Sequence, residues 1–145
     1  MNLKWGAITV AIVFAASASS QDTADERKKL AGTWTPTAAE LSGEPFPEEV
    51  RKTIKLVLAG DKYTTMVGKT TDMGTFKLYP AKTPKAMDII GGEGPNKGKT
   101  FLAIYELKGD TLRVCYDLLG KNRPTEFATK KGTPLFFVTY RRMKP

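Results

Sequence analysis

The sequence has no histidine and only one cysteine, Cys115, among its 145 residues. Without histidine, neither a Ser-His-Asp nor a Cys-His nucleophile can be assembled, and zinc sites of the usual histidine type are excluded. A single cysteine cannot form an intrachain disulfide, so the hydrophobic core must hold the fold together. Cys115 lies in an alternating run, residues 112–116, which predicts a buried and unreactive thiol.

The sequence also lacks an ordered nucleotide or catalytic motif. Residues 94–100 end like a phosphate-binding P-loop, but Glu93 stands where the motif requires glycine. A strand-like run follows instead of the helix whose N-terminus would bind phosphate. We therefore interpret this segment as a glycine-rich loop between two strands, and we expect neither a cofactor nor a metal site.

The acidic residues offer carboxylates but no ordered pair for acid–base catalysis, so we expect the protein not to be an enzyme. One set of polar residues is the candidate for a functional cluster. Our interpretation is a buried hydrogen-bonded network that fixes the loops, because buried charges are usually paired. Carboxylate-based catalysis is the alternative for this candidate polar cluster, which consists of Asp88, Tyr105, Arg123 and Glu126.

Long hydrophobic runs are lacking beyond the N-terminus. There, Lys4 precedes twelve apolar residues, 5–16, and the small residues Ala16 and Ala18 follow the A-x-A pattern. This plan predicts a signal peptide over residues 1–18, too short to span a bilayer, which takes about 20 residues. Cleavage after residue 20 and an uncleaved anchor are the alternatives.

Export therefore follows as an expectation, either to a periplasm or to the cell exterior. Residues 19–29 are expected to form a flexible segment, with one helical turn at 26–30. Residues 30–145 are expected to form the folded domain. No transmembrane span is expected after cleavage, because no other apolar run is long enough.

The net charge is +8, and the excess lies in the second half of the chain. Residues 76–145 hold 14 basic and 6 acidic side chains, so attraction to anions is expected from this half. Aromatic and basic residues do not alternate as single-stranded nucleic acid would require, and nucleic acid is not an expected partner.

Short strand-like runs separated by Gly, Pro and Asp predict an all-β fold. Gly60-Asp61 and Gly109-Asp110 each join two runs as a hairpin turn would. One short helix is expected from Pro47 to about Lys52. Eight strands predict an antiparallel barrel of the lipocalin-like, calycin type, with a two-sheet sandwich as the alternative. The expected strands are 33–40, 54–58, 62–67, 73–79, 85–90, 101–107, 111–117 and 135–141.

The triplet Gly32-Thr33-Trp34, together with Arg141 and Arg142 at the end of the last strand, resembles the G-x-W motif and terminal arginine of lipocalins. The resemblance implies that an arginine packs over the indole and closes one end of the barrel, a cation–π contact. The alternation of residues 136, 138 and 140 puts Arg142 on their face of the strand, but it does not settle which arginine meets Trp34.

More of the chain resembles the lipocalin-like domain family of uncharacterised exported proteins that is abundant in planctomycete bacteria. This resemblance implies a lipocalin-like barrel without an established activity, and it brings no catalytic residues. The segments that carry it are Leu30–Trp34, Gly60–Tyr63, Gly74–Phe76, Pro84–Ile89, Glu93–Thr100, Ile104–Leu107 and Arg123–Phe127.

We therefore expect the barrel to bind a small apolar or amphipathic ligand, with an anionic head group near the basic residues. The alternative is a structural or interaction protein of the cell envelope whose barrel is filled by its own side chains and holds no ligand. The sequence leaves the oligomeric state open. The residues expected to face the interior are Leu56, Phe76, Ile89, Ile104, Val114 and Phe136.

Overall fold

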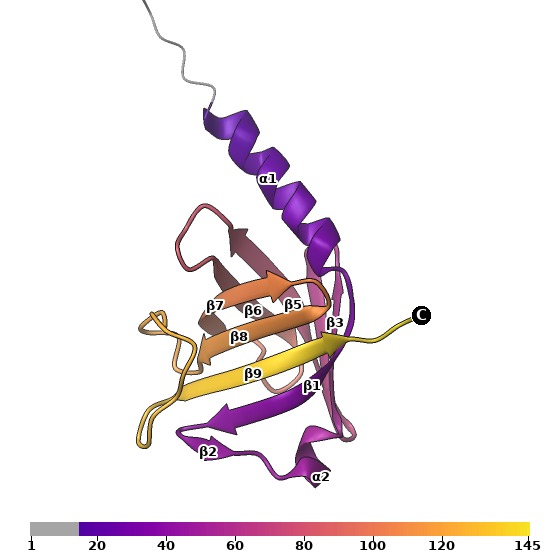
Figure 1. Ribbon diagram of the computed structural model, residues 1–145, viewed down its shortest axis with the longest axis vertical. Helices are drawn as coiled ribbons and strands as arrows, with labels where there is room; N and C mark the ends of the chain where they lie inside the picture. The colour runs from indigo at the N-terminus through magenta and orange to yellow at the C-terminus, as the bar shows by residue number, and fades with distance from the viewer. Residues whose placement is uncertain (1–14) are drawn as a thin grey trace, which may run out of the picture.

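Nine strands pair in one antiparallel sheet within residues 15–145, the part of the chain that the computed structural model describes. Eight of them form a closed ring, because the first and the last also pair with each other (Figure 1). The expected eight-stranded barrel is therefore confirmed, and the sandwich is wrong. The elements are α1 (Ala15–Leu30), β1 (Gly32–Leu41), β2 (Glu44–Pro45), α2 (Glu48–Arg51), β3 (Ile54–Ala59), β4 (Lys62–Val67), β5 (Thr70–Tyr79), β6 (Ala86–Glu93), β7 (Thr100–Lys108), β8 (Thr111–Asp117) and β9 (Leu135–Arg142).

The barrel has two different ends. The closed end holds the last turn of α1, the start of β1 and the tight turns at Gly60 and Gly109. Both glycines have a positive φ, near 59° and 58°, which other residues adopt only with strain. The open end holds α2, the β6–β7 loop and the long β8–β9 loop.

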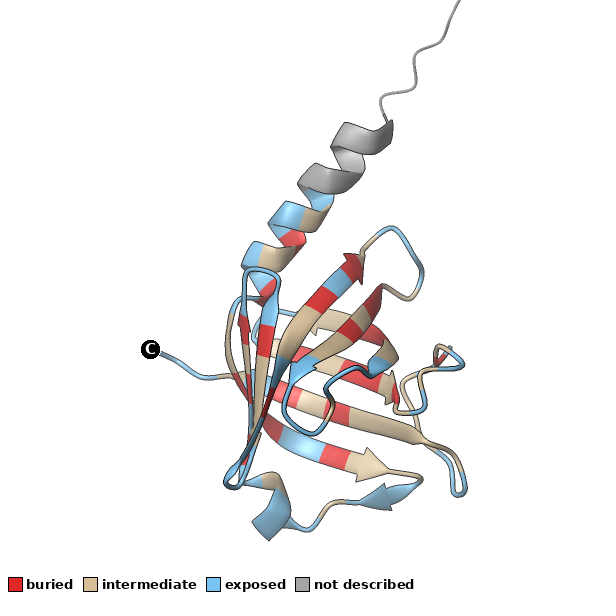
Figure 2. Cartoon of the chain, turned by 180° about the vertical axis from the view of Figure 1, so that it is seen from behind, coloured by how far each residue is buried: buried red, intermediate tan, exposed pale blue. Residues whose placement is uncertain are grey.

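Alternation along the strands separates an inner from an outer face. On β3, for example, Ile54, Leu56 and Leu58 are buried while Lys55 and Ala59 are exposed (Figure 2). The buried inward side chains of all eight ring strands form one hydrophobic core.

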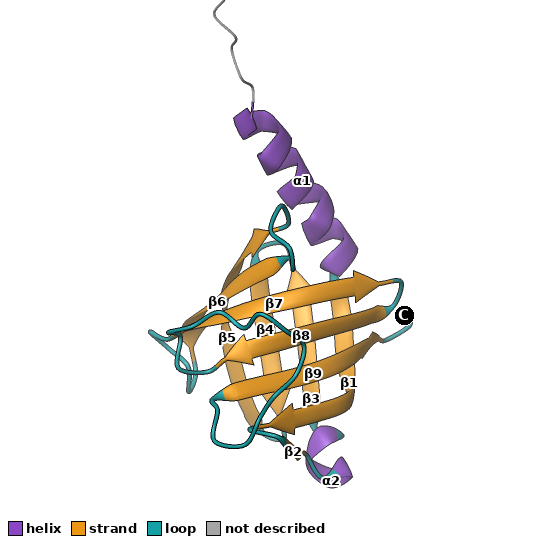
Figure 3. Ribbon diagram, turned by 60° about the vertical axis from the view of Figure 1, so that its left-hand side comes forward, coloured by secondary structure: helices purple, strands orange, loops and turns teal. Residues whose placement is uncertain are grey.

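The long loop between β8 and β9 folds back over the outer face of the sheet (Figure 3). The thiol of Cys115 on β8 donates to the Ala128 carbonyl of this loop at 3.6 Å. The Arg123 guanidinium of the loop donates to the carbonyls of Met87 and Ala103 at 3.0 and 2.9 Å. Part of the outer face is thereby buried as well, and Cys115 is fully buried there, as expected, because the loop covers it.

The N-terminal segment forms a longer helix than expected. Residues 19–29 are helical as part of α1, which extends the helical turn expected at 26–30, and Glu26 and Arg27 near its end bind the barrel. Arg27 donates to the carbonyls of Gly60 and Phe76 at 3.2 and 3.0 Å. The expected signal peptide falls largely on residues 1–14, outside the described residues.

Two smaller expectations concern the segment after β1. The short helix beginning after Pro47 is confirmed as α2. The eight expected strands do not include β2, whose two residues pair with the end of β1. Within residues 15–145, no helix combines the length and hydropathy that a membrane crossing requires.

Candidate ligand-binding site

The barrel encloses a cavity of about 380 Å³. It extends from Leu58 and Leu112, near the closed end, to Leu41, Val67 and Leu118 at the open end. Most of its wall is apolar, and the polar groups on the wall are few. The lining residues with polar side-chain atoms are Tyr63, Thr65, Asp72, Asn96, Tyr116 and Tyr140.

Five of the six residues expected to face the interior line this cavity: Leu56, Phe76, Ile89, Val114 and Phe136. The sixth expectation is wrong.

Ile104 lies on the outer face of β7, beside Arg123 and Pro124 of the β8–β9 loop. Its neighbour Tyr105 takes the inward position and belongs to the core. The burial of Ile104, only 1% exposed, comes from the covering loop, so burial alone does not mark the interior.

An aromatic stack stands at the open end of the cavity. The Phe136 ring packs between Phe46 and Tyr116, with ring centroids 5.2 and 5.7 Å away. Phe46 reaches this place because its backbone N–H donates to the Ala39 carbonyl at 2.9 Å, which folds the segment after β2 back toward β1. The stack gives the cavity entrance a flat apolar side, a surface suited to a planar or extended apolar molecule.

The β6–β7 loop is tied to the cavity wall through Asp72. This carboxylate accepts hydrogen bonds from the Tyr63 hydroxyl at 2.8 Å and from the backbone N–H and side-chain amide of Asn96, each at 3.0 Å. Close packing requires glycine at the base of the loop, since a Cβ on Gly91 would lie 1.8 Å from the Asn96 carbonyl oxygen. The segment that resembles a P-loop is thus a structural loop between two strands, as expected.

A pair of tyrosine hydroxyls forms the other polar group on the wall. Tyr116 of β8 and Tyr140 of β9 lie with their hydroxyl oxygens 3.0 Å apart. Burial raises the pKa of Tyr140 to about 12. Burial, and then the neighbouring Tyr140 and Tyr63, raise the pKa of Tyr116 well above its ordinary value near 10. Both phenols are therefore neutral at physiological pH and can act as hydrogen-bond donors.

The candidate polar cluster does not form as one group. Asp88 and Arg123 make an ion pair of 2.5 Å, and the Tyr79 hydroxyl donates to the same carboxylate at 2.8 Å. These groups lie on the outer face, so they do not reach the cavity. Tyr105 points to the opposite face and Glu126 is exposed to solvent. The Asp88–Arg123 ion pair holds the β8–β9 loop against the barrel, which is the role expected of the cluster. The four residues of the cluster do not, however, converge on one site.

The closed end matches the lipocalin resemblance at Trp34, which is fully buried beneath Arg142. The guanidinium carbon of Arg142 lies 4.3 Å from the Trp34 ring centroid. Arg142 also donates to the Lys29 carbonyl at 2.7 Å and to the Ala31 carbonyl. Arg141, the other arginine that the sequence leaves possible, lies on the outer face and is exposed, so it takes no part in the closure. Gly32 has a φ near 139°, which other residues adopt only with strain, so glycine is needed beneath the Arg142 guanidinium.

Glu26 of α1 is buried against the barrel, where its carboxylate accepts from Lys85 Nζ at 2.9 Å and from the Tyr105 hydroxyl at 3.0 Å. Glu26→Ala is expected to lower the free energy of unfolding by about 1–3 kcal/mol, because it leaves the buried Tyr105 hydroxyl without its acceptor. Urea denaturation measures this change.

The matched control is Tyr105→Phe, alone and combined with Glu26→Ala. The double variant should lose less than the sum of the two single losses, since one shared hydrogen bond is removed twice. Strict additivity would show that the contact contributes no stability.

Sequence reasoning missed several residues of the site: Phe46, Tyr63, Asp72, Asn96 and the Tyr116–Tyr140 pair. The alternation that predicts an inward Val114 also places Tyr116 inward. Tyr116 could therefore have been predicted as a cavity residue from the sequence. Asn96 lies in a loop and carries no such signal. Among residues 15–145, no three acidic or cysteine side chains are grouped so that they could hold a metal ion.

Comparisons with protein-family models, with curated proteins and with solved structures gave no match to this chain. The fold itself defines the class: a lipocalin-like antiparallel barrel, closed at one end by Trp34 and Arg142, with an apolar cavity inside.

Proposed function

We propose that the protein binds one small, mostly apolar ligand inside the barrel. The observation that carries this proposal is the cavity: about 380 Å³ stays open between the inward side chains. That volume lies within the ~300–1,000 Å³ typical of small-molecule sites. The large aromatic side chains, which would have to fill the barrel in a purely structural protein, instead stand on its wall.

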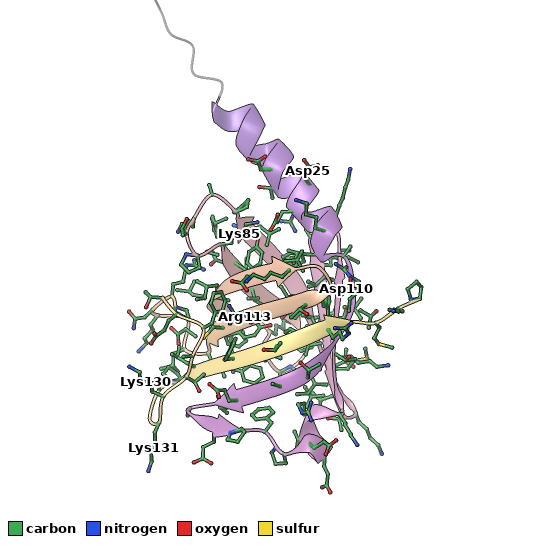
Figure 4. The ribbon with its side chains drawn as sticks, in the orientation of Figure 1. Asp25, Lys85, Asp110, Arg113, Lys130 and Lys131 are labelled. Atoms are coloured by element: carbon green, nitrogen blue, oxygen red, sulfur yellow. The ribbon has the colours of Figure 1, made fainter. Side chains whose placement is uncertain are left out.

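The charges around the cavity support a ligand whose buried part is neutral. None of the cavity-lining side chains in residues 15–145 is a lysine or arginine, and one, Asp72, is a carboxylate. Burying an anion beside this wall would be costly. Exposed lysines lie on the loops of the open end instead: Lys97 on the β6–β7 loop and Lys121, Lys130 and Lys131 on the β8–β9 loop. Figure 4 labels the last two. An anionic head group of an amphipathic ligand would therefore stay at the rim, in water.

A fluorescence titration tests the proposal. The probe is 2-dimethylamino-6-ethylnaphthalene, a neutral fluorescent molecule, and its fluorescence anisotropy is followed because a probe held in the barrel tumbles more slowly. We expect a saturable signal with one probe per chain and micromolar affinity, because the cavity shields the probe from water. A signal that rises without saturating would contradict the proposal and favour the alternative of a barrel without a ligand.

Export is a second part of the proposal, supported by Lys4, the apolar run at 5–16 and the site at Ala16–Ala18. N-terminal sequencing of the protein from its own host should begin at Ser19 or Gln21. An intact Met1 in the cytoplasmic fraction would contradict export but would leave the binding proposal standing.

A further inference from the structure

One of the two hydroxyl hydrogens of the Tyr116–Tyr140 pair makes no hydrogen bond within the described part of the protein. Each neutral phenol carries one O–H donor, and the 3.0 Å contact between the two oxygens consumes one of them. The other O–H meets no acceptor among the side chains and carbonyls that the structure describes. The phenol of Tyr63 is a neighbour of Tyr116, but its only hydroxyl hydrogen is donated to Asp72 at 2.8 Å. Tyr63 therefore offers no free donor to the cavity.

The pair lies in the middle of the cavity wall. In the β8–β9 register, Leu112 faces Tyr140, Val114 faces Val138, and Tyr116 faces Phe136. The two hydroxyls therefore meet over the valine pair, between the floor of the cavity and the aromatic stack at its entrance.

Most other residues on this wall are apolar. The O–H that is not used between the tyrosines is therefore one of the few hydrogen-bond donors that a molecule in the cavity can meet. A ligand that covers this O–H without offering an acceptor leaves the donor unpaired, which costs free energy, whereas a ligand oxygen at this place accepts the hydrogen bond.

We propose that the Tyr116–Tyr140 pair selects ligands that carry a neutral hydrogen-bond acceptor, a carbonyl or ether-type oxygen, on an otherwise apolar body. This inference rests on the proposed function and names the ligand class of the same cavity. The spare O–H donates to the ligand oxygen, while the bond between the tyrosines holds the donor in place. A purely hydrocarbon ligand fits the same space but leaves the donor unmatched.

The test compares two probes with the same naphthalene body. One is 2-dimethylamino-6-acetylnaphthalene, whose ketone accepts a hydrogen bond, and the other is the 6-ethyl probe, which has no oxygen. Each is titrated into the full chain and into Tyr116→Phe, Tyr140→Phe and the double variant. The ratio of the affinity for the ketone to the affinity for the ethyl probe measures what the carbonyl contributes, because a change in cavity shape affects both probes.

Each single variant keeps one tyrosine with a free O–H, so the ratio should change by less than about threefold. The double variant removes both donors, and the preference for the ketone should fall at least about fivefold because the buried carbonyl then lacks a partner. The emission of the bound ketone should also shift to the blue in the double variant, as loss of a hydrogen bond to its carbonyl requires.

Two failures are distinguishable. If the ethyl probe does not bind the unmodified protein, the proposed function fails, and this inference fails with it. If the ethyl probe binds but the ratio and the ketone emission are the same in the unmodified protein and the double variant, only the role of the tyrosine pair is overturned. A ratio that collapses fully in one single variant would also overturn it, because the remaining phenol should still donate.

Discussion

Trp34→Ala is expected to lower the free energy of unfolding by about 3–5 kcal/mol, the usual cost of truncating a large buried aromatic side chain. Trp34 is 0% exposed, and its indole N–H donates to the Leu30 carbonyl at the end of α1 at 2.9 Å. The substitution therefore removes core packing and the link between helix and barrel together. Urea denaturation followed by far-ultraviolet circular dichroism measures the change.

Such a loss is a large part of the stability of a typical domain, which is about 5–15 kcal/mol. Trp34→Phe keeps much of the apolar ring and loses the hydrogen bond, so it should cost clearly less. An unchanged unfolding midpoint for Trp34→Ala would show that the indole does not close the barrel.

The two terminal arginines provide a control within the same strand. Arg142→Ala should cost about 1–2 kcal/mol, because a partly desolvated cation–π contact contributes about that much and the guanidinium also binds the carbonyls at the end of α1. Arg141→Ala should change stability by less than about 0.5 kcal/mol, as expected for an exposed residue. Equal losses at the two positions would contradict the observed closure.

The second large effect concerns binding. Thr65→Phe is expected to weaken binding of the ethyl probe at least about tenfold, because the new ring occupies volume that the probe needs. Thr65 faces the cavity from β4, where it lies between Leu56 and Asp72 in the register. The unfolding midpoint should hold or rise, since the added ring buries apolar surface in existing space.

Thr64→Phe is the matched control, with the same change one position away. Thr64 points to the outer face of β4, because successive side chains of a strand alternate. Probe affinity should therefore stay within about twofold of the unmodified protein. Equal weakening by both variants would mean that the probe binds elsewhere or that the barrel is generally disturbed.

The barrel could be predicted from the sequence because its signals are local. Alternation shows in single strands, and Gly60 and Gly109 mark their turns. Alternation also puts Arg142 on one face with Val138 and Tyr140, but the sequence leaves open which arginine meets Trp34, and only the structure places Arg142 over the indole.

The failures arise where distant segments cover a strand. Ile104 is misassigned because the β8–β9 loop buries the outer face of β7, and a strand buried on both faces gives no clear alternation. Glu26 finds its partners at Lys85 and Tyr105, far along the chain. No local pattern indicates such contacts, so the docked end of α1 could not be predicted.

The cavity could be predicted only as one of two outcomes. The same inward residues can line a space or fill it, and the difference depends on the barrel radius and on side-chain directions. Here the Phe136 ring stacks along the wall between Phe46 and Tyr116 instead of crossing the interior. That arrangement depends on the fold of the segment after β2, which the sequence pattern leaves undetermined.

The central claim is that a small apolar molecule binds inside the barrel, and nuclear Overhauser effects between the bound ethyl probe and labelled methyl groups test it most directly. The predicted result is a set of contacts from the probe to the methyl groups of Leu56, Ile89 and Val114, which line the cavity. Ile104 has the same kind of methyl groups on the outer face and should show none. Contacts to Ile104 without contacts to the three inward residues would contradict the account.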